Sequence, residues 1–122
     1  MSKKLIIVMV NTDPSSPSEL GAPFFQATVA ASMGFEVEIV LTGRSGELAK
    51  KGIAEKIFTH EGSSRSVYDF MKESHDAGAK FKICTPTLEI WGEDLIPEID
   101  ETVGAAYVIS EAMADNTVTF TY

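Results

Sequence analysis

Apolar residues along the chain gather into short runs separated by polar turns. Residues 4–10 form an unbroken apolar run rich in Ile and Val, and residues 35–41 and 80–84 form two further runs. Such runs, bounded by turn residues, are typical of strands covered on both faces. Residues 116–122 differ, because apolar side chains alternate there with threonines. This alternation predicts a strand with one face in the core and one polar face.

Helices are predicted between these strands. Pro23 stands where a first helical position would be, and the small and apolar residues 24–33 follow it, as expected of a helix packed under other elements. Gly34 would end this helix. A second helix over 64–77 carries apolar residues at spacings of three and four. A third is predicted over about 101–115.

Local signals sharpen the boundaries of the second helix. Ser66 and Asp69 have the spacing of a capping pair, and Gly78 is placed to close the helix. The stretch before this helix predicts only a short helix at 47–51 and a short strand or loop at 56–58.

The order of elements, strand then helix repeated along the chain, predicts an α/β fold. Right-handed crossovers in this pattern give a mostly parallel sheet with helices on both sides. The chain has 122 residues, a length that fits one domain over 1–122.

Charge and cysteine content narrow the classes of function. A net charge of −8 argues against binding to nucleic acid or to an anionic membrane surface. The six-residue apolar run 5–10 is too short for a signal peptide or a membrane span. One cysteine forms neither an internal disulfide nor a Cys-rich zinc site, and the two histidines have no partner at metal-ligand spacing. We therefore expect a cytoplasmic protein with no bound metal.

Candidate chemistry gathers where strands are predicted to end. In an open α/β sheet, ligands bind at the carboxyl ends of strands, where residues 11–21, 42–46 and 84–91 would lie. Asn11, Thr12 and Asp13 make the first of these segments polar.

Arg44 and the backbone N–H groups of its loop offer an anion site, although a solvated turn is the favoured interpretation. Neither a P-loop nor a GxGxxG motif is present, so we expect no cofactor.

Cys84 is the strongest nucleophile in the sequence. It ends a predicted strand, with Thr85 as the expected N-cap and Pro86 as the expected first residue of a following helix. The positive end of a helix favours the thiolate. Two nearby glutamates oppose ionisation, and Arg44 is the nearest candidate cation. The alternative is that Cys84 is a small buried apolar residue.

Other titratable residues are interpreted as structural. His75 near a helix C-terminus is explained by the helix dipole, and His60 is interpreted as a surface or structural residue. Glu98, Asp100 and Glu101 are interpreted as a solvated approach to the last helix.

The segment from Cys84 to Ala106 carries a set of short motifs in a fixed order. A strand ends in Cys84 and a short helix follows; then come the motifs Trp91-Gly92, Asp94-Leu95-Ile96-Pro97 and Val103-Gly104-Ala105. In this order the chain resembles the DsrE/DsrF-like family of small sulfur-relay proteins, and the resemblance spans nearly the whole chain.

The resemblance implies a fold, an assembly and a chemistry. The fold is a three-layer α/β/α arrangement with flavodoxin-like layering and a sheet of about five strands, and the assembly is a homo- or hetero-oligomer. Cys84 would carry sulfur as a persulfide, receiving it from a donor protein and passing it to a partner thiol. In the carrier hypothesis the backbone N–H groups around Thr85 and Thr87 would stabilise the thiolate. Independently of the resemblance, Trp91 belongs to an apolar cluster just past the cysteine that would shield the thiol or form a subunit contact, with core packing as the default interpretation.

Two functions of different classes remain open at this stage. The first is a sulfur carrier or sulfurtransferase subunit, with Arg44 and the Asn11–Asp13 loop as weaker candidates for the pocket. The second is a non-catalytic oligomeric binding subunit in which Cys84 only packs. A small-anion or nucleotide binder that uses the strand-end loops is a third, weaker alternative.

Overall fold

Five parallel strands form one sheet in the order β4-β3-β2-β1-β5. The computed structural model describes residues 3–122. The strands are β1 (Lys4–Met9), β2 (Glu36–Leu41), β3 (Lys80–Cys84), β4 (Ile99–Val103) and β5 (Thr117–Thr121). Among the described residues, no helix is long and apolar enough to cross a membrane.

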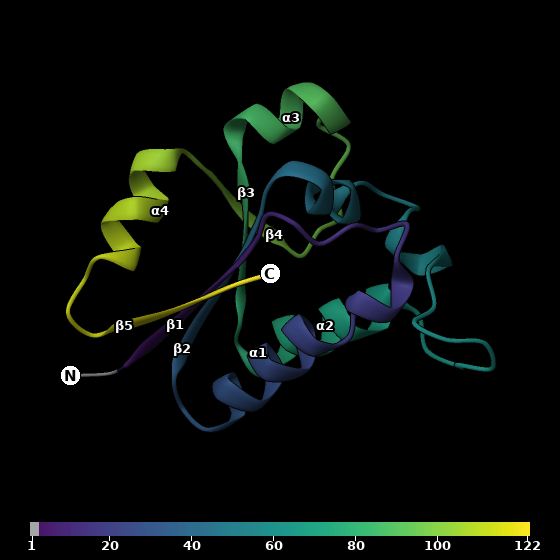
Figure 1. Cartoon of the computed structure of the whole chain (residues 1–122), viewed down its shortest axis with the longest axis horizontal. Helices are drawn as coiled ribbons and strands as arrows, with labels where there is room; N and C mark the ends of the chain where they lie inside the picture. Colours follow the sequence, from purple (N-terminus) through teal and green to yellow (C-terminus); the bar gives the residue numbers. More distant parts are fainter. Residues whose placement is uncertain (1–2) are drawn as a thin grey trace.

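Helices cover both faces of the sheet, as Figure 1 shows. They are α1 (Ala22–Ser32), α2 (Val67–Ala77), α3 (Thr85–Trp91) and α4 (Ala105–Ala112), with short 3-10 helices η1 (Pro17–Glu19), η2 (Gly43–Ala49) and η3 (Ala54–Lys56). Helices α1 and α2 pack together on one face, where Thr28 and Ser74 share a 2.8 Å hydrogen bond. Helix α4 lies on the other face. The predicted three-layer α/β/α fold is therefore confirmed.

The main core lies between the sheet and the pair α1 and α2. Phe24 of α1 stacks on Phe81 of β3, with ring centroids 6.2 Å apart, and Ile7, Ile39 and Met71 are fully buried around them. Burying a side chain of this size contributes about 1.5–3 kcal/mol, so this side of the sheet supplies most of the hydrophobic stabilisation.

A smaller apolar cluster lies on the other face. It consists of Ile6, Val40 and Cys84, with Val8 and Val108 packed against it. Residues two apart on a strand share a face. The same alternation that sends Ile7 and Ile39 toward α1 and α2 therefore sends Ile6 and Val40 toward α4.

The predicted end signals of α1 and α2 are confirmed. The Ser66 hydroxyl accepts a hydrogen bond from the N–H of Asp69, and the Asp69 carboxylate accepts one from the N–H of Ser66, which forms a capping box. Gly78 closes α2 at a φ of +118°, and Gly34 follows α1 at a φ of +93°. Both glycines occupy the left-handed region that side chains disfavour.

The predicted helix over 101–115 is wrong in its first part, because β4 occupies Ile99–Val103 and α4 begins only at Ala105. The acids near β4 are not a solvated approach to a helix. Asp100 accepts a 2.9 Å hydrogen bond from the N–H of Phe81, and Glu98 accepts one of 2.7 Å from Tyr68. The strand conformation of Ile99–Val103 comes from pairing with β3, which the local sequence does not reveal.

Of the two alternatives for residues 56–58, the loop is confirmed, because η3 ends at Lys56 and the chain continues as a loop whose Ile57 packs against the core. One further expectation is corrected. The apolar residues of β5, Val118 and Phe120, are each 41% exposed rather than in the core. β5 is an edge strand, and α1 does not extend over it far enough to cover this face.

Candidate functional site

Three strand-end segments meet at the carboxyl edge of the sheet. A guanidinium nitrogen of Arg44 lies 2.6 Å from Oδ2 of Asp13, which joins the loops after β1 and β2. The indole N–H of Trp91 donates a 3.0 Å hydrogen bond to the carbonyl of Gly43, which joins α3 to η2. The predicted candidate residues Asp13, Arg44 and Trp91 therefore come together, through contacts that fix the loops to one another.

The loop 42–46 is not the solvated turn that the sequence favoured. It opens η2, and Ser45 is fully buried, donating to the carbonyl of Met9 and, over 2.9 Å, to that of Thr42. Gly46 packs so closely on α3 that a Cβ at this position would lie 1.9 Å from Cγ2 of Thr87. The threonine is itself buried. Its side chain therefore packs against η2.

In the polar loop after β1, the carboxylate of Asp13 accepts hydrogen bonds from within the loop. Hydrogen bonds from the N–H and hydroxyl of Ser15, with further help from Arg44, hold the pKa of the Asp13 carboxyl below its usual range. Asn11 is exposed and Thr12 is buried. Arg44 keeps most of its side chain in solvent, at 70% exposure. Its guanidinium is thus exposed while it pairs with Asp13.

Cys84 lies where the sequence placed it, at the last position of β3. It is the N-cap of α3 in place of the predicted Thr85, which is instead the first helical residue, with Pro86 second. The Cys84 side chain makes no capping hydrogen bond, and the Thr85 hydroxyl donates to the carbonyl of Val103 over 3.2 Å. The thiol therefore does not cap α3, and the Cys84 side chain packs on the sheet face with Ile6 and Val40.

The surroundings of the thiol are apolar. Cys84 is 9% exposed and packs with Ile6 and Val40, and Val108 of α4 covers this cluster. No local pattern in the sequence points to Val108, because nothing local says which helix crosses over the end of β3. Access to the thiol thus depends on α4.

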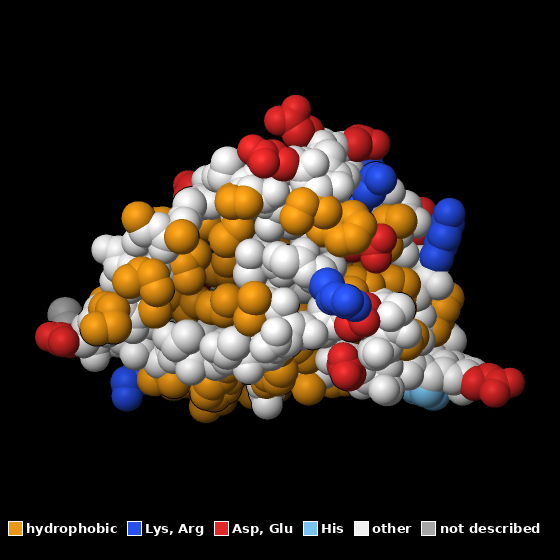
Figure 2. Space-filling view, turned by 45° about the horizontal axis from the view of Figure 1, so that its top comes forward, with side chains coloured by type: hydrophobic (Ala, Val, Ile, Leu, Met, Phe, Trp, Pro, Cys, Tyr) orange, Lys and Arg blue, Asp and Glu red, His pale blue; other side chains and the backbone are white. Residues whose placement is uncertain are grey.

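Helix α4 is held on the sheet mainly by polar contacts. The Tyr107 hydroxyl donates a 2.7 Å hydrogen bond to Glu38, and Glu111 lies 2.6 Å from the ammonium group of Lys4. Lys4 also pairs with Glu38. No residue of α4 is fully buried. Ile109 within the helix is 63% exposed, and Met113 just after the end of the helix is 77% exposed. In Figure 2 hydrophobic side chains are exposed in both halves of the face shown, including the left half, the side of α4.

Charged and polar groups under α4 shift the pKa values of Lys4 and Tyr107. Burial disfavours the charge on Lys4, but hydrogen bonds from its ammonium group to Glu111 and Glu38 outweigh burial and raise its pKa. Burial, with the hydrogen bond to Glu38, raises the pKa of Tyr107 to about 12. The signal for this cluster is in the sequence: Lys4 and Glu38 are charged residues inside buried strands, where a charge needs a partner.

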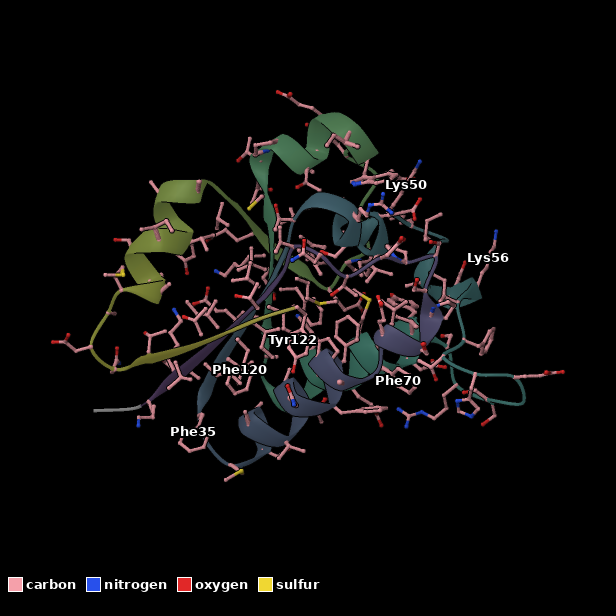
Figure 3. The ribbon with its side chains drawn as sticks, in the orientation of Figure 1. Phe35, Lys50, Lys56, Phe70, Phe120 and Tyr122 are labelled. Carbon is pink, nitrogen blue, oxygen red and sulfur yellow. The ribbon has the colours of Figure 1, made fainter. Side chains whose placement is uncertain are left out.

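Two hollows of the described surface lie away from Cys84. A groove of about 460 Å³ lies between α1 and β5; its lining residues include Phe25, Val29, Met33, Phe35, Val118 and Phe120. Figure 3 shows Phe35 and Phe120 on the same side of α1. A second, open hollow of about 570 Å³ lies beside η3 and the loop that follows it. Cys84 lines neither hollow.

The histidines have structural partners. His75 lies 3.1 Å from Asp100 through Nε2, and His60 lies 3.1 Å from the Thr59 hydroxyl through Nδ1. Within residues 3–122, no group of three or more His, Cys, Asp and Glu side chains is arranged to hold a metal ion.

Comparisons with known proteins identify a family and a similar fold for this chain. The model of the DsrE/DsrF-like family matches residues 4–120. Among solved structures, the YchN protein of E. coli is similar over 100% of both chains, with a TM-score of 0.76 and 12% sequence identity. At this identity the likeness concerns the fold. No curated protein matches the chain significantly.

Proposed function

The chain belongs to the DsrE/DsrF-like family, and we propose that it is a sulfur carrier that holds sulfane sulfur as a persulfide on Cys84. The observation that carries the proposal is the place of the only cysteine, at the carboxyl end of β3 and the start of α3. This is the edge of an α/β sheet where reactive groups gather. Membership in a family that is linked in general to sulfur relay supports sulfur transfer as the chemistry of this thiol.

The proposed transfer balances without an external oxidant. The Cys84 thiolate attacks the outer sulfur of a donor persulfide, R–S–SH. The S–S bond of the donor breaks, the donor leaves as the thiolate R–S⁻, and Cys84 becomes Cys84–S–SH. In the second step an acceptor thiolate attacks that outer sulfur and releases the Cys84 thiolate. Donor and acceptor are thiols of partner proteins, and a reducing compartment such as the cytoplasm suits a protein whose single thiol must stay free.

Access to Cys84 is part of the proposal. At 9% exposure the thiol does not meet a macromolecular partner directly. Helix α4 covers it with Val108 and is anchored mostly by polar contacts, which a partner can exchange for its own. We infer that displacement of α4 precedes transfer. Arg44, an exposed cation of the same edge, is then the proposed contact for an anionic donor segment.

A second candidate function rests on the same burial. Cys84 packs between Ile6 and Val40 as a small apolar residue does, and α4 displays exposed apolar side chains. In this alternative the protein is a non-catalytic subunit of an oligomer, and the thiol only fills the cluster. The two candidates differ in one measurable property, the reactivity of the thiol.

Intact-protein mass spectrometry after incubation with polysulfide tests the proposal. The mass of the wild-type protein is expected to rise by whole sulfur atoms, about 32 Da each, and a reductant is expected to remove them. The mass of Cys84→Ser is expected to stay unchanged. A folded wild-type protein that gains no sulfur, even when a donor is present in large excess, overturns the carrier proposal and favours the binding subunit.

A second measurement separates carriage from mere reactivity. The loaded protein is mixed with a small acceptor thiol and the masses of both are followed. Loss of 32 Da from the protein together with its appearance on the acceptor supports relay. Retention of the sulfur by the folded protein contradicts relay, because a carrier must release what it holds.

A further inference from the structure

Lys82 places a positive charge on the same face of the sheet as Cys84. It lies two residues before the cysteine on β3, and residues two apart on a strand share a face, with Cα atoms about 6.6 Å apart. The Cα partner of Lys82 on β2 is Val40, which belongs to the apolar cluster around Cys84. The lysine therefore borders the cluster that holds the thiol.

The ammonium group of Lys82 is largely removed from water. The side chain is 12% exposed, and the ammonium nitrogen lies 3.2 Å from a carboxylate oxygen of Glu101 on β4. The same nitrogen lies 5.5 Å from the ring centre of Tyr107 on α4. Glu101 itself is 56% exposed. An ion pair with an exposed partner is weak, so the contact with α4 is an important part of what holds this charge in place.

Helix α4 covers the ammonium group and the thiol with successive residues. Tyr107 lies over the ammonium group of Lys82, and Val108 packs on the cluster that contains Cys84. Displacement of α4, which the proposed function requires, therefore uncovers both groups at once. The lysine stem is flexible, and without the tyrosine ring its ammonium group is free to turn along the sheet face toward the sulfur.

Other charged and titratable groups near this part of the face come from every neighbouring element. They are Lys4 of β1, Glu38 of β2, Lys80 of β3, Glu101 of β4, and Tyr107 and Glu111 of α4. Lys4 is already paired with two glutamates, Glu38 and Glu111. Lys80 is exposed at the far end of β3.

Arg44, the cation that the sequence favoured as a neighbour of the thiol, pairs with Asp13 in the loop after β1. Lys82 combines three properties that suit it to the role instead. It shares the face of Cys84, its acidic partner is mostly exposed, and the helix that covers it also covers the thiol.

We propose that Lys82 stabilises the Cys84 thiolate during sulfur transfer, once α4 is displaced. This inference rests on the proposed carrier function. In the second step of transfer, an acceptor thiolate attacks the outer sulfur of Cys84–S–SH and becomes the new persulfide. The S–S bond breaks, and its electron pair stays on the Cys84 sulfur. The ammonium group stabilises this negative charge by attraction and gives up no proton.

Lys82 also has a purely structural interpretation, in which its ion pair with Glu101 only fixes the edge strand β4. The two roles differ in what they predict for Glu101. If the pair only fixes β4, Lys82→Met and Glu101→Gln break the same contact and act alike. If Lys82 serves the thiol, Glu101 competes for its charge. Removing the glutamate then favours the thiolate, whereas removing the lysine disfavours it.

The pH profile of Cys84 alkylation by iodoacetamide tests the proposal. Compared with wild type, Lys82→Met is expected to react about threefold more slowly at the acidic end of the profile and at least as fast on its alkaline plateau. The reason is that a thiol that ionises at higher pH gives a more nucleophilic thiolate. Lys82→Arg keeps a cation and is expected to restore the wild-type profile. Glu101→Gln is expected to move the profile to lower pH.

The shape of the profile is the quantity to compare, because a pH-independent change in the opening of α4 multiplies the rate by the same factor throughout. Lys72→Met is the matched control. The Lys72 ammonium group lies 3.5 Å from Asp69 and 4.8 Å from the ring centre of Tyr68, on the face opposite Cys84. This variant loses an ion pair and a ring contact of the same kind and is expected to keep the wild-type profile. Circular dichroism confirms that each variant is folded.

Two outcomes overturn the role of Lys82. The first is a Lys82→Met profile with the same shape as that of wild type. The second is a shift of Lys82→Met and Glu101→Gln in the same direction, which marks a structural pair.

Uptake of sulfur from polysulfide, measured on the same proteins by intact mass, separates this inference from the function on which it rests. A folded wild type that gains no sulfur overturns the carrier function, whatever the alkylation profiles show. A wild type that gains and releases sulfur, together with an unchanged profile in Lys82→Met, leaves the carrier function standing and overturns only the role of Lys82.

Discussion

The Tyr107 hydroxyl donates a 2.7 Å hydrogen bond to Glu38, and through it α4 is tied to the centre of the sheet on the face where Cys84 lies. The other face has a counterpart, because the Tyr68 hydroxyl of α2 donates a 2.7 Å hydrogen bond to Glu98. Burial and the glutamate acceptor raise the pKa of each tyrosine to about 12. Only the first of these bonds holds the helix that covers the thiol.

Removing the first bond is expected to expose Cys84. Tyr107→Phe loses a hydrogen bond that contributes about 1–2 kcal/mol, so opening of α4 becomes roughly 5- to 30-fold more favourable. The rate of Cys84 alkylation by a small maleimide, measured under native conditions, is expected to rise by a similar factor. Tyr68→Phe is the matched control, with comparable loss of stability and unchanged alkylation. An equal rise in both variants means that global unfolding, rather than α4, exposes the thiol.

The charged pair under α4 gives a prediction on stability. Lys4 and Glu38 are each less than 10% exposed, and Lys4→Met leaves the carboxylate of Glu38 without its cation. Breaking a buried pair in this way costs about 3–5 kcal/mol in the free energy of unfolding, measured by urea denaturation. The double variant Lys4→Met with Glu38→Gln is expected to recover part of the loss. Lys51→Met, whose ion pair with Asp94 is exposed, is expected to change little.

Gly46 gives a prediction on close packing. Gly46→Ala places a methyl group 1.9 Å from Cγ2 of buried Thr87, so the contact of η2 with α3 must shift, at about 1–3 kcal/mol. Thr87→Ser removes that Cγ2, and the double variant is expected to regain most of the stability in a thermal denaturation cycle. Gly104→Ala, where a Cβ meets nothing within 4 Å, is the control. Additive losses in the double variant would contradict the contact.

The pH dependence of stability is expected to involve Asp100. Burial opposes its charge, but hydrogen bonds from the Phe81 N–H and from His75 outweigh burial and lower the pKa of the carboxyl. A pKa lower in the folded than in the unfolded state stabilises the fold above the unfolded value of about 4. This stabilisation is lost as the pH falls through the lowered pKa.

Asp100→Asn removes that contribution. The variant is expected to be about 1 kcal/mol less stable than wild type at pH 7, and the difference is expected to shrink toward pH 2. Urea denaturation at several pH values measures it. A difference that is constant with pH would show that the charge of Asp100 plays no part. Asp94→Asn, at a side chain that is 74% exposed, is the control.

Much of the fold follows from local patterns in the sequence. The apolar runs locate β1, β2 and β3, and the capping box with Gly78 bounds α2, because strand burial and helix capping both act over a few residues. β4 escapes such patterns. Its sequence IDETV is mostly exposed, and its strand conformation comes from pairing with β3 some twenty residues away.

The candidate site divides in the same way. The sequence places Cys84 at the end of a strand, because the apolar run 80–84 and the Thr-Pro pair directly after it are both local signals. Its burial under Val108, and the tie between Tyr107 and Glu38, depend on where α4 crosses the sheet. That crossing runs from one edge of the sheet to the other and is not encoded in any short segment. The roles proposed for the site residues stay predictions.

By itself, then, the sequence determined the α/β class, the order of most elements and the position of the only thiol, because periodicity, capping and turn residues act locally. Only the tertiary structure decided that β5 lies uncovered at an edge and that Cys84 lies beneath a polar-anchored helix. Both depend on which surfaces meet across the sheet. Such contacts arise from packing between segments far apart along the chain, which no local pattern records.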